Sequence, residues 1–572
     1  MDGTFKLEEG ILSGMAKGST ENRASSGSFK RCRGGHAVRL SAKKILALMP
    51  FVALMMAAPT RVMSGEESSL PTGEAIQSQP MVSPSDRLPS EMSRAQFIQY
   101  VLIRNNVIAG QQLTAAIAEE GVVQAKSAFE PVGKLSMMNS SLRQRSTAEE
   151  ELVRMNQALY SRRNRTADAG VSVLTPTGAT VEGKVVWDDI RSNLQALRNT
   201  PEEYKSSVDL SLIQPLAKDG GVEVASAKTR IAEMERSAAE HTRDAVLSTV
   251  VSTAITAYLD LRLAQERQQI WDQGMRVAGK LLDEARSLHR QGRLAESAIL
   301  DVENSYVLYQ VGSSEARQRL VEALGVVRNL LLMGNSSSLS ASDSIAGLAL
   351  QKEEPSFDEL LQKAIGNRSE YLARKATLDK EGIRVAYADN QTMPRIDLVA
   401  SYGLNSLEYA GDKSLSGLSD GEYPSWKVGV TASFPLGGNQ GANAELRTAK
   451  MNKEKALLDL MAVESTIANE IQNGLAAHRS SRERLQSYQQ ILTTGEKQLA
   501  MERQMLMTGR SDMRSVLSRE ESLVRTRVSL LEQKVALEKA KVSLELAQGI
   551  LLARYPMTGK GKEVHSAVGE GQ

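Results

Sequence analysis

An internal duplication is the sequence feature that most restricts how this chain can fold. Residues 208–216 read VDLSLIQPL and residues 428–436 read VGVTASFPL, and the prolines near their ends are 220 residues apart. A glycine-containing turn and a long helical pattern follow each segment. A second pair of turns, at Gly292 and Gly509, is 217 residues apart. Self-similarity at a fixed separation indicates one structural unit that is used twice.

Each copy of the unit has the order helix, strand, strand, long helix, turn and helix. The predicted helices are 93–130, 221–291 and 294–333 in the first copy and 356–390, 443–508 and 511–553 in the second. The longest two would extend over ~100 Å at about 1.5 Å per residue. Only 15 of the 572 residues are proline, and none lies between Pro215 and Pro355 or between Pro435 and Pro556. Helices of this length are therefore permitted.

These patterns and the composition between them predict the domain organisation. We expect an N-terminal extension and signal peptide (1–64), a flexible linker (65–92), a first repeat (93–335), a connector (336–355), a second repeat (356–555) and a disordered tail (556–572). Hydrophobic residues at 41% and charged residues at 24% exclude disorder of the whole chain. Aromatic residues at 4% are too few for a conventional large core.

An apolar run at 45–58 follows Lys43 and Lys44 and precedes small residues, which is the pattern of an export signal. Its 14 residues are fewer than the ~20 of a membrane-spanning helix. A buried core helix is the alternative. The long segment ahead of the run is either a genuine extension or a consequence of a true start at Met15. The single cysteine, Cys32, precedes the run, so we expect neither a disulfide nor a lipid-bearing cysteine in the mature chain.

Two segments of the second repeat, 396–404 and 426–434, alternate between apolar and polar residues. Period-two alternation puts one face of a strand in an apolar medium and the other in a polar medium. An amphipathic strand of a soluble sheet would look the same. We expect about four such strands per chain, near the ~10 residues that cross an outer membrane. Since four strands cannot close a barrel and lipid does not tolerate open edges, several chains would have to pool them.

The last predicted helix independently indicates that several chains associate. It has two heptad seams, one from Val524 to Leu552 and the other from Leu530 to Leu551. The seam centres stand ~150° apart at about 103° per residue. A surface helix needs one apolar stripe. Two nearly opposite stripes suit a helix that has a neighbouring helix on each side in a closed ring, which we call a stave. A solvent-exposed antiparallel coiled coil is the alternative.

The order of several short motifs resembles that of the TolC-like outer membrane efflux proteins over residues 93–555. The motifs are the export signal and linker, Ala257–Leu261 (AYLDL), Gly292 followed by Ile299–Val302 (ILDV), Pro394–Leu398 (PRIDL), and Phe434–Gly438 (FPLGG) followed by Ala444 and Ala449. The resemblance implies a mainly α homotrimer with a twelve-stranded transmembrane β-barrel in outer-membrane lipid, continued by a twelve-helix α-barrel tunnel across the periplasm. Such proteins are passive exit ducts of tripartite efflux pumps or type I secretion systems, and dock with a periplasmic adaptor and an inner-membrane transporter.

The resemblance also assigns candidate site residues. It places the turns between paired helices at the periplasmic end, where the adaptor would contact Gly292, Arg293, Leu294, Gly509, Arg510 and Asp512. The same glycines would equally serve only to reverse the chain. The aperture candidates are Arg514, Ser515, Ser518 and Arg519, and the two serines stand where the best-known members have carboxylates. The membrane-strand candidates are Ile396, Leu398, Tyr402, Trp426, Val428, Val430 and Phe434.

The first repeat is less regular than the second. Residues 132–144 alternate poorly where the first membrane strand is expected. The polar stretch 146–169 and the alternating segment 181–187 indicate either an extracellular loop or an additional hairpin.

Catalytic functions are not indicated. The five histidines are scattered without the spacing of a zinc site, and Gly437, Gly438 and Gly441 lack the context of a phosphate loop. With 70 basic and 68 acidic residues, bulk charge does not point to nucleic acid. We therefore predict a non-enzymatic export duct without cofactor or metal. The competing class is a periplasmic coiled-coil adaptor or structural protein, which would have one hairpin flanked by small β-domains rather than a duplicated unit.

Overall fold

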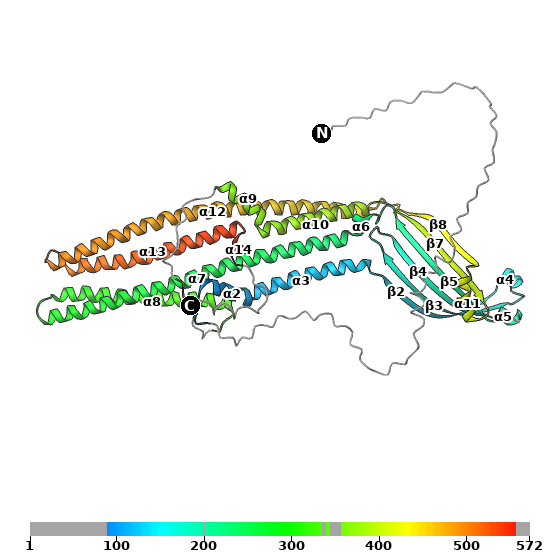
Figure 1. Ribbon diagram of the computed structural model, residues 1–572, viewed down its shortest axis with the longest axis horizontal. Helices are drawn as coiled ribbons and strands as arrows, with labels where there is room; N and C mark the ends of the chain where they lie inside the picture. The colour runs from blue at the N-terminus through cyan, green and yellow to red at the C-terminus, as the bar shows by residue number, and fades with distance from the viewer. Residues whose placement is uncertain (1–88, 199–200, 335–338, 344–355, 556–572) are drawn as a thin grey trace, which may run out of the picture. The chain divides into compact units, whose positions relative to one another are not determined.

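The computed structural model describes residues 89–198, 201–334, 339–343 and 356–555. The predicted signal peptide, almost all of the predicted linker, most of the connector and the tail lie outside the described residues. The described chain consists mainly of long helices that run side by side and a six-stranded sheet (Figure 1). The predicted fold class, mainly helical with a small β part, is confirmed.

The helices repeat in the predicted order. The first repeat contains α2 (Arg94–Arg104), α3 (Asn106–Lys126), α6 (Val222–Ala225), α7 (Ala227–Arg290) and α8 (Glu296–Leu331), and the second contains α9 (Phe357–Asn367), α10 (Ser369–Gln391), α12 (Gln440–Met507), α13 (Met513–Ala547) and α14 (Leu551–Arg554). The two longest, α7 and α12, have 64 and 68 residues. After each of them the chain reverses direction at a turn, and the next helix packs back against the long one, which gives the hairpins α7–α8 and α12–α13.

Each predicted short helix is in fact two helices. Asn105 ends α2 and begins α3, because its Oδ1 accepts hydrogen bonds from the N–H groups of Val107 (2.9 Å) and Ile108 (3.4 Å). A side chain that caps the start of a helix in this way accepts from N–H groups that would otherwise bond to backbone carbonyls of a continuous helix. Arg368 separates α9 and α10 at the equivalent place, and its guanidinium instead lies 2.7 Å from the Glu470 carboxylate of α12. The first break has a local sequence signal, whereas a tertiary contact accompanies the second.

Helix α13 has the two opposite seams that its heptads predict. One seam, with Leu531 and Val535, packs in a cluster with Ile255 of α7. The other, with Leu544, packs in a cluster with Ile471 of α12. Helix α13 therefore contacts α7 and α12 on separate faces, as a stave between two neighbours does.

The outermost helices keep apolar side chains exposed. Helices α3, α7, α10 and α12 contact one another in that order. On one flank, α3 exposes 62% of Leu113 and 72% of Ile117, and on the other α12 exposes 61% of Met451 and 60% of Leu458. Clustered apolar exposure of this kind marks contact with another molecule. The layer of helices is therefore incomplete at both flanks.

The sheet has six antiparallel strands in the order β2, β3, β4, β5, β7, β8. They are β2 (Val132–Arg145), β3 (Leu159–Leu174), β4 (Thr180–Ser192), β5 (Glu203–Pro215), β7 (Arg395–Glu408) and β8 (Tyr423–Ser433). The second repeat contributes the two predicted strands, but the first contributes four, since β3 and β4 form the additional hairpin. The prediction of about four strands per chain, and so of twelve in a trimer, was too low. The run Arg162–Arg165 is polar on both faces of β3 and hid this strand from a search for alternation.

A short parallel ladder fixes the end of the predicted linker and part of the predicted connector. Strand β1 (Glu91–Met92) pairs with β6 (Ser340–Ala341). The hydroxyl of Tyr258, on α7, donates to the carbonyl of Met92 (2.9 Å) and accepts from the amide N–H of Asp343 (3.3 Å). These residues are therefore anchored on α7 and do not act as flexible linker.

Two aromatic side chains that pack against glycines set the register of the α7–α8 hairpin. Tyr309 of α8 lies over Gly274 of α7, and Trp271 of α7 lies over Gly312 of α8. The two ring centroids are 6.0 Å apart. A Cβ atom at either glycine would overlap the facing ring, so only glycine permits this approach.

We expect Gly312→Ala to destabilise the hairpin by about 1–3 kcal/mol, because the added methyl group overlaps the ring of Trp271. Gly325→Ala, on the same helix, is the matched control. No atom lies within 4 Å of the position that its Cβ would take, and alanine favours a helix by up to ~1 kcal/mol over glycine. Thermal unfolding of the two variants measures the difference. Equal melting temperatures would show that the aromatic–glycine contact does not fix the register.

Candidate functional site

The sheet has one apolar and one polar face. One row of the apolar face runs through Val171, Gly183, Leu210, Tyr402 and Trp426, which are cross-strand partners from β3 to β8. This face is exposed, with 75% of Trp426 and 56% of Leu210 accessible. Within the described chain, no long helix packs across either face of the sheet. A soluble sheet would cover such a face, so this one borders an apolar medium.

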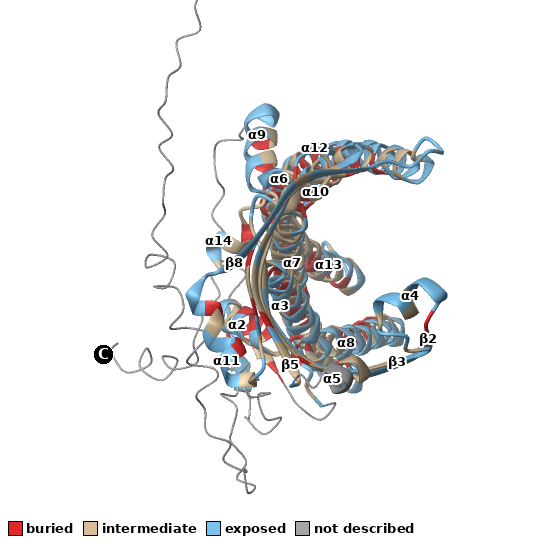
Figure 2. Cartoon of the chain, turned by 90° about the vertical axis from the view of Figure 1, so that its right-hand side faces the viewer, coloured by how far each residue is buried: buried red, intermediate tan, exposed pale blue. Residues whose placement is uncertain are grey.

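The apolar face is the convex one. Helix α11 (Gly411–Ser416) lies on the convex side of the curved sheet (Figure 2). It contacts the sheet through Ser414, whose hydroxyl is 2.8 Å from that of Ser206. Ser206 is two residues from Val208 on β5 and therefore shares its face. The apolar residues thus point outward from the curve and the polar ones inward.

The apolar band approaches the height of a membrane. Eight residue steps separate Ile396 from Leu404 on the convex face of β7, which is ~26 Å along the strand. With the strand tilt of about 40° found in barrels, the band is ~20 Å tall, close to the ~25 Å of transmembrane barrels. The predicted membrane-strand residues Ile396, Leu398, Tyr402, Trp426, Val428 and Val430 lie on this face of β7 and β8, and Phe434 follows β8 directly.

The concave face is charged and hydrogen-bonded across strands. Lys184 of β4 is 3.6 Å from Asp168 of β3, which also accepts a hydrogen bond from Ser136 of β2. Thr166 donates to Asp188 on the neighbouring strand (2.5 Å). Because charges of both signs are paired there, the concave face is hydrophilic without a dominant sign. Such a surface is suited to line a water-filled space.

The two turns between paired helices have the same backbone geometry. Gly292 has φ +72° and Gly509 has φ +68°, in the left-handed region that favours glycine. In each turn the next residue, Arg293 or Arg510, donates its N–H to a carbonyl five residues earlier, at 2.9 Å in both. This is the hydrogen bond of a Schellman turn. Chain reversal alone therefore accounts for the glycines, and their role in adaptor contact stays a prediction.

Asp512 begins α13. Its Oδ1 accepts a hydrogen bond from the N–H of Ser515 (2.7 Å). That bond, with a smaller contribution from the positive charge of Arg514, lowers the pKa of Asp512 below its ordinary value. Leu294, from the first turn, packs where Leu517 of α13 is buried against the α7–α8 hairpin. The N-terminal part of α13, which follows the second interhelical turn, thus packs against the first interhelical turn.

The remaining aperture candidates make few contacts. Arg514 is 79% exposed, and its Nε is 4.0 Å from Asp301 of α8. Arg519 donates to Oε1 of Gln498 on α12 (3.4 Å). Ser518 is exposed. Arg514 therefore links the second hairpin to the first, while Arg519 acts within the second.

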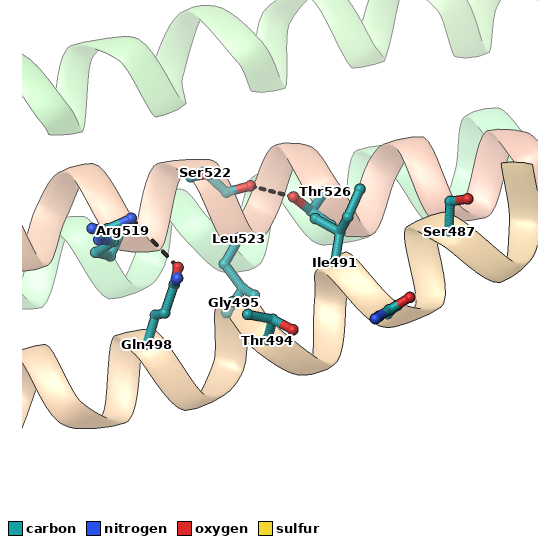
Figure 3. Close-up of a pocket in the computed structure, with 10 residues that line it drawn as sticks. Ser487, Ile491, Thr494, Gly495, Gln498, Arg519, Ser522, Leu523 and Thr526 are labelled. Carbon is teal, nitrogen blue, oxygen red and sulfur yellow. Dashed lines mark hydrogen bonds between the residues drawn. The ribbon is translucent and has the colours of Figure 1, made fainter.

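The α12–α13 hairpin lacks the two aromatic–glycine contacts of α7–α8, which we call the aromatic–glycine interlock. In the second repeat, 217 residues later, Trp271 and Gly274 correspond to Tyr488 and Ile491, and Tyr309 and Gly312 correspond to Thr526 and Ser529. A groove of about 430 Å³ occupies this region, lined by Ile491, Thr526 and Gly495 among others (Figure 3). Sequence reasoning missed this asymmetry, although the loss of Trp and Gly from matched positions of the two repeats was a signal that could have found it.

Several channels of known structure share this fold. CmeC of Campylobacter jejuni, an outer-membrane channel, matches with a TM-score of 0.54 and 14% identity over 80% of this chain and 85% of CmeC. The outer-membrane channel OprN matches with a TM-score of 0.57 and 17% identity, over 80% of this chain and 89% of OprN. The open state of the MtrE outer-membrane channel of Neisseria gonorrhoeae matches with a TM-score of 0.54 and 15% identity, over 80% of this chain and 89% of MtrE. The fold is that of these outer-membrane channels.

Sequence comparison matches part of the chain to a family. The family described as outer membrane efflux protein matches residues 360–549. Outer membrane protein TolC of Escherichia coli (strain K12) is 23% identical over 213 residues, which are 36% of this chain and 43% of TolC. The aligned region thus spans less than half of that relative. These findings confirm the resemblance to the TolC-like outer membrane efflux proteins.

We expect Asp512→Ala to speed amide hydrogen exchange in the first turn of α13, because the N–H of Ser515 loses its acceptor. Asp512→Asn keeps an acceptor and is the matched control. The lowered pKa means that the stabilisation by the wild-type carboxylate is present above its ordinary value of 3.8 and is lost as the pH falls through the folded-state pKa. The measurement is amide hydrogen exchange by mass spectrometry at neutral pH. Identical exchange rates in the wild type and Asp512→Ala would contradict the capping role.

Proposed function

We propose that this chain is one subunit of a homotrimeric outer-membrane channel, the passive exit duct of a tripartite efflux pump or a type I secretion system. The sheet lies in the outer membrane and the helices form a tunnel that extends into the periplasm. The channel provides a path while the transporter supplies the energy. No bond is made or broken in the duct, so we do not expect it to be an enzyme.

One observation carries the proposal: a single-layer sheet with an uncovered apolar face and two unpaired edges. Strands β2 and β8 each have one neighbour in the described sheet. In water, the sheet would expose apolar residues such as Trp426 and Val428. In lipid, each unpaired N–H or C=O group of an open edge costs several kcal/mol. Closure with other copies is the arrangement that satisfies both conditions.

The free edges and flanks suit a ring of copies. Strand β2 runs away from the helices and β8 runs back toward them, so β2 of one copy can pair antiparallel with β8 of the next. The ~150° between the seams of α13 is also the interior angle of a regular twelve-sided ring. Three copies with four staves each supply this ring. With six strands each they supply an eighteen-stranded barrel, and barrels of about 16–18 strands enclose an aqueous channel.

The turns at Gly292 and Gly509 are the proposed docking site for a periplasmic adaptor, which would connect the channel to an inner-membrane transporter. Arg293, Arg510 and Asp512 are exposed there. Their charges and the exposed turn backbone would be the groups available to a partner.

We expect opening to realign the α12–α13 hairpin while α7–α8 stays in place. The aromatic–glycine interlock holds α7 and α8 in register. At the matched level, α12 and α13 border a groove instead. The second hairpin is tied to the first by buried Leu517 and by the exposed contact of Arg514 with Asp301. Partner binding that favours the open arrangement would shift this equilibrium.

A periplasmic coiled-coil adaptor is the competing function, and the duplicated unit with its two-faced sheet does not favour it. Fractionation separates the two. An outer-membrane trimer that requires detergent and dissociates on heating supports the channel. A folded monomer that is stable in buffer without detergent would overturn it.

We expect Val428→Arg to block assembly in the outer membrane, because it places a charge near the middle of the lipid-facing band at a cost of about 2–4 kcal/mol. Thr431→Arg, on the same strand, is the matched control. Its side chain lies on the concave face with Lys427, where a charge is already present. The measurement is the amount of heat-sensitive trimer in the outer-membrane fraction. Equal loss of trimer in both variants would show that the convex face does not border lipid.

We expect Arg514→Ala to raise the conductance of the channel in planar bilayers, because the tie to Asp301 is lost. An exposed ion pair is worth up to ~1 kcal/mol, so the open population should rise by at most about fivefold. Asp301→Asn should have the same effect, and the double variant should add nothing further. Arg519→Gln should also change the conductance through its contact with Gln498. If conductance is unchanged in all of these, the two arginines do not belong to the gate.

A further inference from the structure

An arginine-rich area follows the apolar band at the end of the sheet that is farther from the helices. This arginine patch consists of Arg143 and Arg145 on β2, Arg163 and Arg165 on β3, and Arg191 on β4, all on the convex face. The stacked rings of Trp187 and Tyr204, 5.8 Å apart, mark the boundary of the band. Aromatic side chains favour the interface between lipid tails and headgroups. The patch begins one row of residues beyond that boundary.

The charges of the patch are only partly balanced. Asp189 lies 3.1 Å from Arg191 and 4.0 Å from Arg165, and Glu202 lies 2.7 Å from Arg191. Five arginines against these two carboxylates leave three positive charges. Within the described residues, no carboxylate forms an ion pair with the other three arginines of the patch. Helix α4 (Ala148–Val153) follows β2 with Glu149, Glu150 and Glu151, but the ion pair described there joins Glu150 to Arg154.

The register places the arginines close together. Arg163 and Arg191 are directly opposed partners on β3 and β4, so their Cβ atoms are about 4.5–5.5 Å apart. Asp189 and Glu202 offset the charge of Arg191, whereas that of Arg163 has no carboxylate partner within the described residues. Arg143 lies diagonally from Arg163, since its partner is Ser161. Both Arg143 and Arg163 are exposed, with their guanidinium groups available to an outside ligand.

We propose that the arginine patch binds the phosphate groups of an anionic glycolipid in the leaflet that surrounds this end of the sheet. The inference rests on the proposed outer-membrane location. Guanidinium groups bind phosphate with paired, charge-assisted hydrogen bonds. Basic clusters at the edge of a membrane-spanning region recognise anionic headgroups. The apolar band would hold the acyl chains of the same lipid, so one molecule contacts both surfaces.

The test uses the full-length protein in phosphatidylcholine nanodiscs with and without diphosphorylated lipid A. Native mass spectrometry counts the lipid A retained per trimer. We expect the wild type to retain lipid A, and the double variant Arg143→Gln/Arg163→Gln to retain it at least about tenfold more weakly, the factor that corresponds to one lost charge-assisted hydrogen bond. Lys205→Gln/Lys427→Gln removes the same charge from the concave face and should retain lipid A as the wild type does.

Three outcomes would overturn the proposal. Equal retention by both double variants would show that the patch is not the site. Equal retention of dephosphorylated lipid A would show that the acyl chains alone bind. Full displacement of lipid A by millimolar inorganic phosphate would indicate a site for free anions.

A fourth outcome concerns the neighbouring copy. If Arg143→Gln/Arg163→Gln lowers the dissociation temperature of the trimer in lipid-free neutral detergent, the patch binds carboxylates of the next subunit, such as Asp420 or Glu422 beside β8, and the proposal fails. Failure of the channel function is distinguishable, because the wild type would then form neither a trimer nor a conducting pore. A conducting trimer without selective lipid retention refutes only the lipid site.

Discussion

The structure depends on one constraint: the backbone groups at the edges of the sheet and the apolar side chains at its convex face cannot both be satisfied within one copy. Strands β2 and β8 each lack a second neighbour in the described sheet. An edge is tolerated in water but not in lipid, and an uncovered apolar face is tolerated in lipid but not in water. Pairing the edges with other copies resolves the conflict, because it leaves the apolar face toward lipid and the charged face toward the lumen. The exposed apolar flanks of α3 and α12 impose the same geometry on the helices.

Within a copy, the two hairpins are built from one pattern but packed differently. In α7–α8, Trp271 and Tyr309 each fill the space over a glycine, so that sliding one helix along the other would drive a ring into backbone. In α12–α13, Ile491 and Thr526 border a groove, and the apolar side chains of Leu499, Val516 and Leu523 pack together toward the turn. The two copies of the unit therefore differ in how the register of their hairpins is fixed, and this difference is the basis of the opening movement proposed above.

The sequence was sufficient where the pattern is local and periodic. The seams of α13, the alternation around Trp426 and the turns at Gly292 and Gly509 each follow from a repeat or a glycine, and the structure has them as predicted. It was insufficient where a contact between distant segments decides. Arg368 interrupts a helix beside Glu470, far along the chain. For the segment of β3, the sequence left a loop and an additional hairpin open because its arginines make both faces polar, and the place of the strand in the sheet follows only from pairing with β2 and β4.

In the proposed trimer, the additional hairpin would allow a barrel of eighteen strands and a tunnel of twelve helices to be built from the same chain. Strand β3 runs toward the helices and β4 runs away from them, and the turn between the two strands lies beside the start of α6, where Gly221 donates its N–H to the carbonyl of Thr177 (3.2 Å). A hairpin adds strands in pairs, so β5 still enters α7 from the same end and in the same direction as it would without the insertion. The number of long helices per copy is unchanged, while the sheet gains two strands per copy. In the proposed trimer, separate segments of the sequence would therefore set the widths of the barrel and the tunnel.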